Sequence, residues 1–155
     1  MSEDDLVAFL QEKGLLHRER SCAKGHAMKL TSGRSGRSPT WRCRADGCSQ
    51  EVSIREGTWF DGPRRRTSLE TAVLFMYDWC RQTYSIQNCE RELGMCRSAA
   101  VTWNRWMRNL ATEAASMEIG QTIVTGGEQV WRRRCGGQDP FEQLLKDVST
   151  LCPPS

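Results

Sequence analysis

The pattern of hydrophobic residues is clearest in the middle of the chain. In "TSLETAVLFMYDWCRQTY", apolar residues recur three and four positions apart, which predicts one buried face of a helix near residues 68–83. Thr67 and Glu70 have the spacing of a capping box, in which the hydroxyl and the carboxylate bond amides of the first turn. Cys80 lies in the apolar stripe, so it is predicted to be a core residue rather than a ligand.

Two more helices are predicted downstream, separated by a short break. Ser85 is a good N-cap for a helix in "SIQNCERELG", and Gly94 stands where a helix ends with a residue of positive φ. A long helix follows in "RSAAVTWNRWMRNLATEAASM". Three helices with a tight glycine-containing turn between the last two describe a helix-turn-helix domain, which we expect over residues 67–116.

The long helix has an apolar side and a polar side when successive residues are spaced by about 100°. The apolar side is expected to supply the core: Ala99, Ala100, Trp103, Trp106, Met107, Leu110 and Ala114. The polar side carries Arg and Asn and no acid before Glu113, and such side chains can bond guanine and adenine in the major groove. A solvated face is the ordinary meaning of this pattern, but the missing acids and the helix-turn-helix setting favour contact with double-stranded DNA. The residues expected to take part are Arg97, Ser98, Thr102, Arg105, Arg108 and Asn109.

The part of the chain before residue 67 has a different pattern. "KLT", "TWRC" and "QEVSIRE" alternate over a few residues, as short strands do, and a Gly- and Ser-rich segment joins the first two. We therefore expect a small β-ribbon over residues 20–57. The predicted fold class is α+β and mainly α: an N-terminal helix over 1–16, a zinc-ribbon-like module over 17–62, the helix-turn-helix domain over 67–116, and a divergent, poorly ordered tail over 117–155.

Four residues with metal-ligand chemistry flank the expected strands. The series reads Cys22-x3-His26, sixteen residues, then Cys43-x4-Cys48. Two ligand pairs in turns, joined by a hairpin, supply the four tetrahedral donors that zinc requires, so we expect Cys22, His26, Cys43 and Cys48 to bind zinc. The alternatives are ordinary thiols in the core or at the surface, or a variant site that has lost its metal.

The N-terminal sequence indicates the compartment. "MSEDDLVAFLQEKG" is acidic and lacks the basic start and continuous apolar run of a signal peptide. No run of about 18 apolar residues is present for a membrane span. We therefore expect an intracellular protein, nuclear if the organism is eukaryotic, with reduced thiols and no membrane partner.

Positive charge is concentrated around the expected ribbon. Residues 17–66 carry twelve Lys and Arg against five Asp and Glu, whereas the whole chain has a net charge of only +3. The excess includes the run Arg64, Arg65 and Arg66 at the junction with the helices. Such a run is commonly a solvated loop, but beside a DNA-binding module it is expected to contact phosphates.

Several of these stretches together resemble a known family. "WRCRADGCSQEVSIREGTWF", a helix ending "YDWCRQTY" and "ERELGMCRSAAVTWNRWMR" are similar to the N-terminal half of Merlin-type DNA transposases, animal relatives of bacterial insertion-sequence DDE transposases. The resemblance covers about residues 15–130. It implies a zinc ribbon and a helix-turn-helix ahead of a catalytic domain of the ribonuclease-H type. The family's second cysteine pair corresponds to Cys43 and Cys48, and its first to Cys22 and to Gly25, where this sequence lacks the cysteine.

The end of the chain departs from that family. There, a stretch like "TIVTGGEQV" leads into a strand with the first catalytic aspartate, but here Val130 is followed by "WRRRCGGQDPFEQLLKDVSTLCPPS". Asp139 has a loop-like context and Asp147 lies in a predicted short helix, whereas two-metal phosphoryl transfer needs several converging carboxylates. We therefore expect no enzymatic activity and a DNA-binding derivative of a DDE transposase, truncated or domesticated. The alternative is a protein-interaction or structural zinc module, or a decayed fragment without function.

Overall fold

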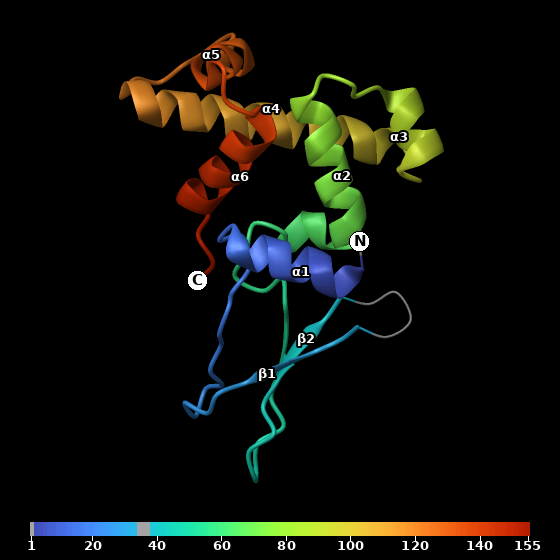
Figure 1. Ribbon diagram of the computed structural model, residues 1–155, viewed down its shortest axis with the longest axis vertical. Coiled ribbons are helices and arrows are strands. Elements are labelled where there is room, and N and C mark those ends of the chain that lie inside the picture. Colours follow the sequence, from blue (N-terminus) through green and yellow to red (C-terminus); the bar gives the residue numbers. More distant parts are fainter. Residues whose placement is uncertain (1, 34–37) are drawn as a thin grey trace. The chain divides into compact units, whose positions relative to one another are not determined.

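The computed structural model describes residues 2–33 and 38–155. The chain divides into two compact units, Met1–Glu70 with Cys152–Ser155, and Thr71–Leu151. Six α-helices, one 3₁₀ helix and one three-stranded antiparallel sheet are formed by the described residues (Figure 1). This confirms the predicted fold class, α+β and mainly α. Within the described ranges, every helix is too short or too polar to cross a membrane.

The first unit begins with α1, Glu3–Glu12. Ser2 caps this helix: its hydroxyl accepts from the Asp5 amide and its own amide donates to the Asp5 carboxylate, each at 3.2 Å. Acidic residues in the first turn stabilise the helix by facing the positive end of its dipole. A helix is therefore present near the N-terminus, as expected, and it belongs to the same compact unit as the ribbon. The buried leucines and valine of this segment are Leu6, Val7, Leu10, Leu15 and Leu16.

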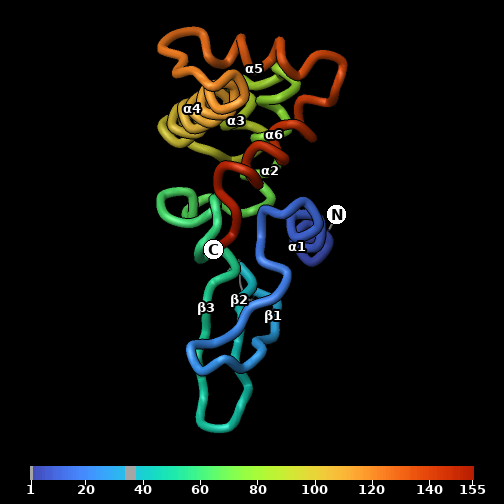
Figure 2. Tube along the Cα trace, turned by 90° about the vertical axis from the view of Figure 1, so that its left-hand side faces the viewer, coloured from blue at the N-terminus to red at the C-terminus, as the bar shows by residue number. Residues whose placement is uncertain are grey.

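The sheet of the first unit consists of three short strands in the order β1-β2-β3 (Figure 2). Their bounds are Lys29–Thr31 for β1, Thr40–Arg42 for β2 and Glu51–Ser53 for β3. The register places Leu30 opposite Trp41, and Trp41 opposite Val52, so these three side chains share one face. Trp41 and Val52 are buried in a small core together with Cys22, Met28 and Cys43. The strands are those that the sequence predicted.

The chain leaves β3 through a compact turn region that ends in η1, a 3₁₀ helix over Gly62–Arg66. This region buries Ile54, Arg55, Trp59 and Phe60. The last residues of the chain join the same unit, because the Ser155 amide donates to the Gly57 carbonyl at 2.9 Å.

The second unit contains the three predicted helices. They are α2, Leu69–Cys80, whose first two residues fall in the first unit, α3, Ile86–Glu92, and α4, Arg97–Ile119. Ser85 caps α3 by accepting from the Asn88 amide at 3.0 Å, and Gly94 follows α3 with φ of +65°. Thr67 differs from expectation: α2 begins at Leu69, and Thr67 instead ends η1.

Aromatic rings hold α2 against α4. The Phe75 ring centroid lies 5.8 Å from that of Trp103 and 5.1 Å from that of Tyr84. Trp103 is buried, as expected, but Trp106 is only half-buried and meets the edge of Trp103 at 5.3 Å. Cys80 is buried, as predicted. Helical periodicity therefore identified this core correctly, and Trp106 lies at its edge.

The C-terminal segment forms two packed helices, so the predicted poorly ordered tail over 117–155 is wrong. α4 continues to Ile119, and α5, Gly127–Cys135, and α6, Pro140–Leu151, follow it. The buried side chains of α5 and α6 are Trp131, Cys135, Leu144, Leu145 and Val148. α5 approaches α4 so closely that a Cβ on Gly127 would clash with the Thr112 side chain. The prediction was wrong because the apolar side chains of this segment become buried only when α5 and α6 pack against α4, and the local sequence pattern does not reveal that surface.

Candidate metal centre and nucleic-acid interface

Two turns position the candidate metal ligands. In the first turn, the Gly25 amide donates to the Cys22 carbonyl and the Cys22 amide to the His26 carbonyl, both at 2.9 Å. Gly25 has φ of +86°, a conformation that residues with a Cβ rarely adopt, so a glycine suits this position. In the second turn, the Cys48 amide donates to the Ala45 carbonyl at 3.0 Å. Each turn thus brings its two ligands to the same side.

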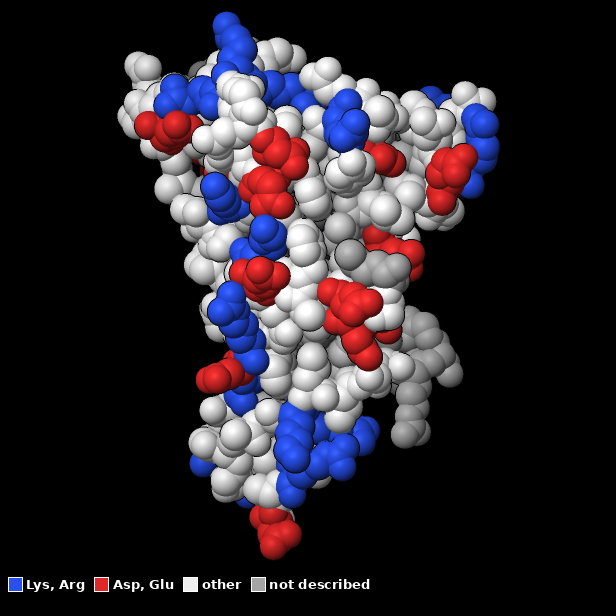
Figure 3. Space-filling model, viewed as in Figure 1, with Lys and Arg blue, Asp and Glu red and all other residues white. Residues whose placement is uncertain are grey.

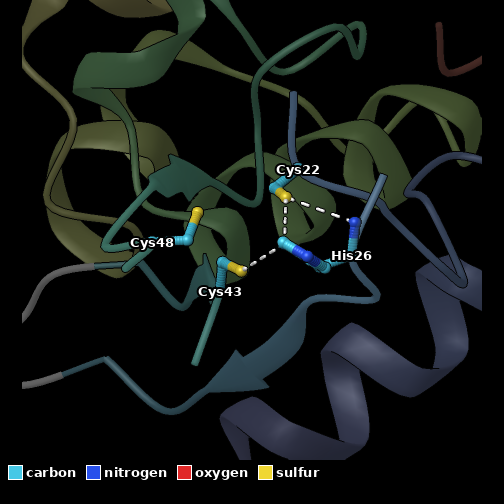
Figure 4. A group of neighbouring side chains, drawn as sticks. All are labelled: Cys22, His26, Cys43 and Cys48. Atoms are coloured by element: carbon cyan, nitrogen blue, oxygen red, sulfur yellow. Dashed lines mark hydrogen bonds between the residues drawn. The ribbon is translucent and has the colours of Figure 1, made fainter. Parts of the chain in front are cut away.

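The four predicted ligands come together. The ligand atoms of Cys22, His26, Cys43 and Cys48 all lie within 4.8 Å of one another. His26 Nδ1 is 3.4 Å from Cys22 Sγ and 3.9 Å from Cys43 Sγ, and Figure 4 shows the imidazole reaching toward both sulfurs. Tetrahedral zinc bonds of the usual lengths separate neighbouring ligand atoms by roughly 3.5–3.8 Å. The cluster therefore could hold a metal ion, and its three sulfurs and one imidazole nitrogen are donors that suit zinc.

Hydrogen bonding at the cluster favours a thiolate at Cys22. Burial raises the pKa of the Cys22 thiol, but hydrogen bonds from the His26 and Lys24 amides and from the Cys43 and His26 side chains outweigh it, and its pKa lies at about 6. The Ala45 amide lowers the pKa of Cys43, but burial and the two neighbouring thiols together raise it above its usual range. Crowded thiols of this kind suit a cation, because the metal replaces their protons.

Two polar contacts tie the turns to each other, and sequence inspection missed both. The Gln50 side-chain oxygen accepts from the Ala23 amide at 2.8 Å, and Lys24 Nζ donates to the Gly47 carbonyl at 3.4 Å. These contacts set the distance between the two ligand pairs. The sequence shows a glutamine, Gln50, two residues after Cys48. It does not show that this side chain is half-buried or that its partner, Ala23, lies 27 positions away.

The predicted DNA-contacting residues of α4 are mostly exposed. Arg97, Ser98, Arg105, Arg108 and Asn109 are exposed, and Thr102 is half-buried with its hydroxyl donating to the Ser98 carbonyl at 2.9 Å. Arg108 differs from the others because its Nε lies 4.0 Å from the Glu128 carboxylate of α5. The packing of α5 therefore brings an acid to the C-terminal part of this face. Arg97 and Arg105 make no ion pair within residues 2–33 and 38–155.

Asn104 shows a limit of the helical wheel. The wheel places it beside the arginines, but its side-chain oxygen accepts from Trp79 Nε1 at 3.0 Å. An indole N–H that is buried needs such an acceptor. Asn104 therefore serves the packing of α2 on α4.

The three junction arginines have three different environments. The Arg64 guanidinium lies 4.3 Å from the Trp59 ring centroid, and its Nε donates to the Trp59 carbonyl at 2.6 Å. Arg65 pairs with Asp61 at 2.8 Å. Arg66 is exposed and forms no ion pair in the described part of the chain. In the sequence these residues form one basic run. In the structure the Arg64 side chain packs against Trp59, whereas the Arg66 side chain is exposed to solvent.

Figure 3 shows Lys and Arg side chains gathered over the strand-bearing part of the first unit. Lys29, Arg42 and Arg44 are exposed in this region. Arg34 and Arg37, which contribute to the basic excess of the sequence, lie outside the described residues. The strand-bearing part of the first unit therefore carries a basic surface.

No protein-family model matches the chain, and neither a curated protein nor a solved structure does so. The resemblance to Merlin-type transposases therefore remains a prediction that depends on the sequence motifs. The Cys/His cluster and the arrangement of α2, α3 and α4 are findings of the structure and do not depend on that resemblance.

Proposed function

We propose that the protein is a zinc-containing, DNA-binding protein without catalytic activity, derived from the N-terminal half of a Merlin-type DDE transposase. The observation that carries the DNA-binding proposal is the exposed α4 face behind the turn at Gly94, with Arg97 in the first turn and Arg105 two turns later. In helix-turn-helix proteins, the N-terminal part of the helix after such a turn enters the major groove.

Arg105 is the residue proposed to read bases. It lies near the middle of the exposed face, between Thr102 and Asn109, and a guanidinium can donate two hydrogen bonds to guanine. Arg97 sits at the helix N-terminus, close to where a backbone phosphate would meet the first-turn amides. Arg66, exposed at the end of η1, is proposed to contact a phosphate.

The metal is proposed to be structural. Four protein side chains surround the position between the two turns, which leaves no open coordination site for a substrate or an activated water. When bound there, zinc would join the two ends of a ribbon whose strands have only three residues each. The chain's own part is to orient its ligands through the turn amides and the contacts of Gln50 and Lys24.

The C-terminal aspartates support the non-catalytic part of the proposal. The Asp147 carboxylate accepts from Trp131 Nε1 at 2.7 Å and from Gln143 Nε2 at 3.0 Å. The Asp139 carboxylate accepts from the Phe141 amide at 3.1 Å at the start of α6. Both groups therefore have roles in joining or capping helices.

Fluorescence anisotropy with duplex DNA, titrated with salt, tests the proposal. Changing Arg97 to Ala should flatten the plot of log K against log salt by about 1 unit, because Arg97 is proposed to contact one phosphate. Lys146→Ala is the matched control, because it removes an exposed charge from α6 in the same unit. Wild-type protein that shows no salt-dependent DNA binding would overturn the proposal.

Base reading is tested separately on a selected DNA site. Arg105→Ala should cost about 1–3 kcal/mol on the preferred sequence and much less on random DNA, because only the preferred site offers the bidentate partner. Equal losses on both DNAs would show that α4 does not read bases.

A second candidate, a protein-interaction module, is favoured by one specific feature. Three apolar side chains around the C-terminal end of α4 are exposed: Met117 at 60%, Ile119 at 39% and Val124 at 89%. Contact surfaces typically contain contiguous exposed apolar groups, and these three side chains are the candidates for such a patch in the second unit. Analytical ultracentrifugation of the wild type and of Met117→Glu would test self-association through this end, and unchanged monomers in both would count against it.

A further inference from the structure

One buried cation in the first unit, Arg55, makes no ion pair with a carboxylate among the described residues. Arg55 is only 2% exposed, although arginine is rarely buried unless it is paired. Its Nε donates to Ser38 Oγ at 3.0 Å, and its Nη1 donates to the Phe60 and Arg64 carbonyls at 3.4 and 3.2 Å. Its side-chain hydrogen bonds come from Nε and Nη1, and Nη2 makes no hydrogen bond to another described residue. A guanidinium with unused donors and no counter-ion is suited to an anionic ligand.

Arg55 opens onto a recess of about 380 Å³ within the same unit. Arg65 and Arg66 of η1 line it as well, so three arginines border one space. The recess is lined by Glu3, Ser38, Ser53, Arg55, Arg65, Arg66, Ser68 and Leu69. The Ser38 hydroxyl accepts from Arg55 and keeps its own proton to donate to a further acceptor.

We propose that this recess binds a phosphate group, with Arg55 as its buried anchor and Arg66 as its exposed rim. A tetrahedral oxyanion offers several acceptors at once, which matches convergent guanidinium and hydroxyl donors better than a single carboxylate does. The same chemistry is present in free phosphate and in a nucleic-acid backbone. The inference does not depend on base reading by α4, because every residue of the recess lies in the first unit.

The electrostatic surroundings agree with this assignment. Burial, and next the positive charge of Arg65, lower the pKa of Arg55, whereas Asp61 and Glu3 act in the opposite direction. Asp61 partly neutralises Arg65 through their ion pair at 2.8 Å. Glu3 lines the recess, and its negative charge is expected to weaken the binding of an anion there.

The test uses the full, zinc-loaded chain labelled with ¹⁵N. Inorganic phosphate is titrated against chloride at constant ionic strength while the arginine Nε–H resonances are followed by NMR. The Arg55 Nε–H signal should shift saturably, and Arg66→Ala should weaken phosphate binding by about tenfold, the loss of one charge-assisted contact. Glu3→Gln should strengthen it by about threefold, because a repelling charge is removed. Arg44→Ala is the matched control, since it removes an exposed arginine from the same unit outside the recess.

Three outcomes would overturn the proposal: no saturable shift of Arg55, equal losses for Arg66→Ala and Arg44→Ala, or equal affinity for acetate and phosphate. Arg66 and Glu3 are exposed, so these variants report on binding even if Arg55→Lys fails to fold. A second titration with duplex DNA identifies the source of the phosphate. Displacement of inorganic phosphate by DNA at the Arg55 signal supports a backbone phosphate, and an unaffected signal supports a free one.

Discussion

The buried cluster beside the sheet of the first unit consists of five residues, two of which are the cysteines Cys22 and Cys43. The core between α2 and α4 in the second unit instead contains Phe75, Trp103 and Met107, each exposed by 1% or less. Large side chains of this kind contribute about 1.5–3 kcal/mol each when buried. The cluster beside the sheet has few such groups, so we expect the stability of the ribbon to depend more on its polar turns and on the proposed metal. The helical unit depends on packed apolar area.

The same difference appears in the polar contacts. In the ribbon, they hold the ligand turns at a set distance, as Gln50 does by accepting from the Ala23 amide. In the second unit, they satisfy groups that packing has already buried. Arg132 donates to the carbonyls of Trp79 and Cys80 at the end of α2, at 2.9 and 3.1 Å. Polar residues therefore build the site in one unit and complete the packing in the other.

Loss of a proposed metal ligand should produce the largest difference in folding between the two units. Zinc binding contributes on the order of 10 kcal/mol in small zinc modules, so Cys43→Ser should unfold the ribbon and leave α4 folded. Hydrogen exchange measured by mass spectrometry should show β1–β3 unprotected and α4 protected, and a chelator should act likewise. Cys96→Ser is the control, because Cys96 is exposed outside the cluster. Equal protection of the strands in both variants would contradict a structural metal.

Truncation of Trp103 should affect only the helical unit. Trp103→Ala should lower the free energy of unfolding by about 3–5 kcal/mol, because it removes a buried ring that contacts Phe75. Trp106→Ala is the comparison, and the half-buried Trp106 should cost clearly less. Chemical denaturation followed by circular dichroism measures both variants. Zinc content that falls with Trp103→Ala would show that the two units are coupled.

The packing of α5 on α4 should be sensitive to one methyl group. Gly127→Ala places a Cβ against the Thr112 side chain and should destabilise the second unit by about 1–3 kcal/mol. Gly137→Ala has open space around the added Cβ and should change stability by less than about 0.5 kcal/mol. Thermal unfolding of the two variants tests this contrast, and an identical effect would remove the argument that the C-terminal helices are closely packed.

The cysteines outside the candidate metal centre should differ in reactivity without any change in stability. The Ser98 side chain, followed by the Ala99 amide, lowers the pKa of the exposed Cys96 thiol, whereas burial raises that of Cys80 to about 12. As pH rises, Cys96 should therefore form its thiolate first and be alkylated by iodoacetamide first. Peptide mass spectrometry over a pH series measures the order. Alkylation of Cys80 before Cys96 in folded protein would contradict the structure of α2.

The sequence by itself determined the features that depend on local spacing. Apolar residues three and four apart marked α2 and the buried side of α4, and Ser85 and Gly94 marked the ends of α3, because caps and periodicity act within one or two turns. The four residues of the candidate metal centre also followed from spacing, since each pair lies within a single turn. Gly25 did not weaken it, because His26 reaches the cluster from the next position.

Only the tertiary structure decided features that depend on distant partners. Arg64 and Arg66 are near neighbours in the sequence, yet Trp59 holds one inward and leaves the other exposed. Asn104 became a packing residue because Trp79 approaches it from another helix. The C-terminal helices became ordered because α4 gives their apolar side chains a surface to cover. Burial of a side chain is a property of its neighbours in space, and for Arg55 those neighbours include residues up to 17 positions away.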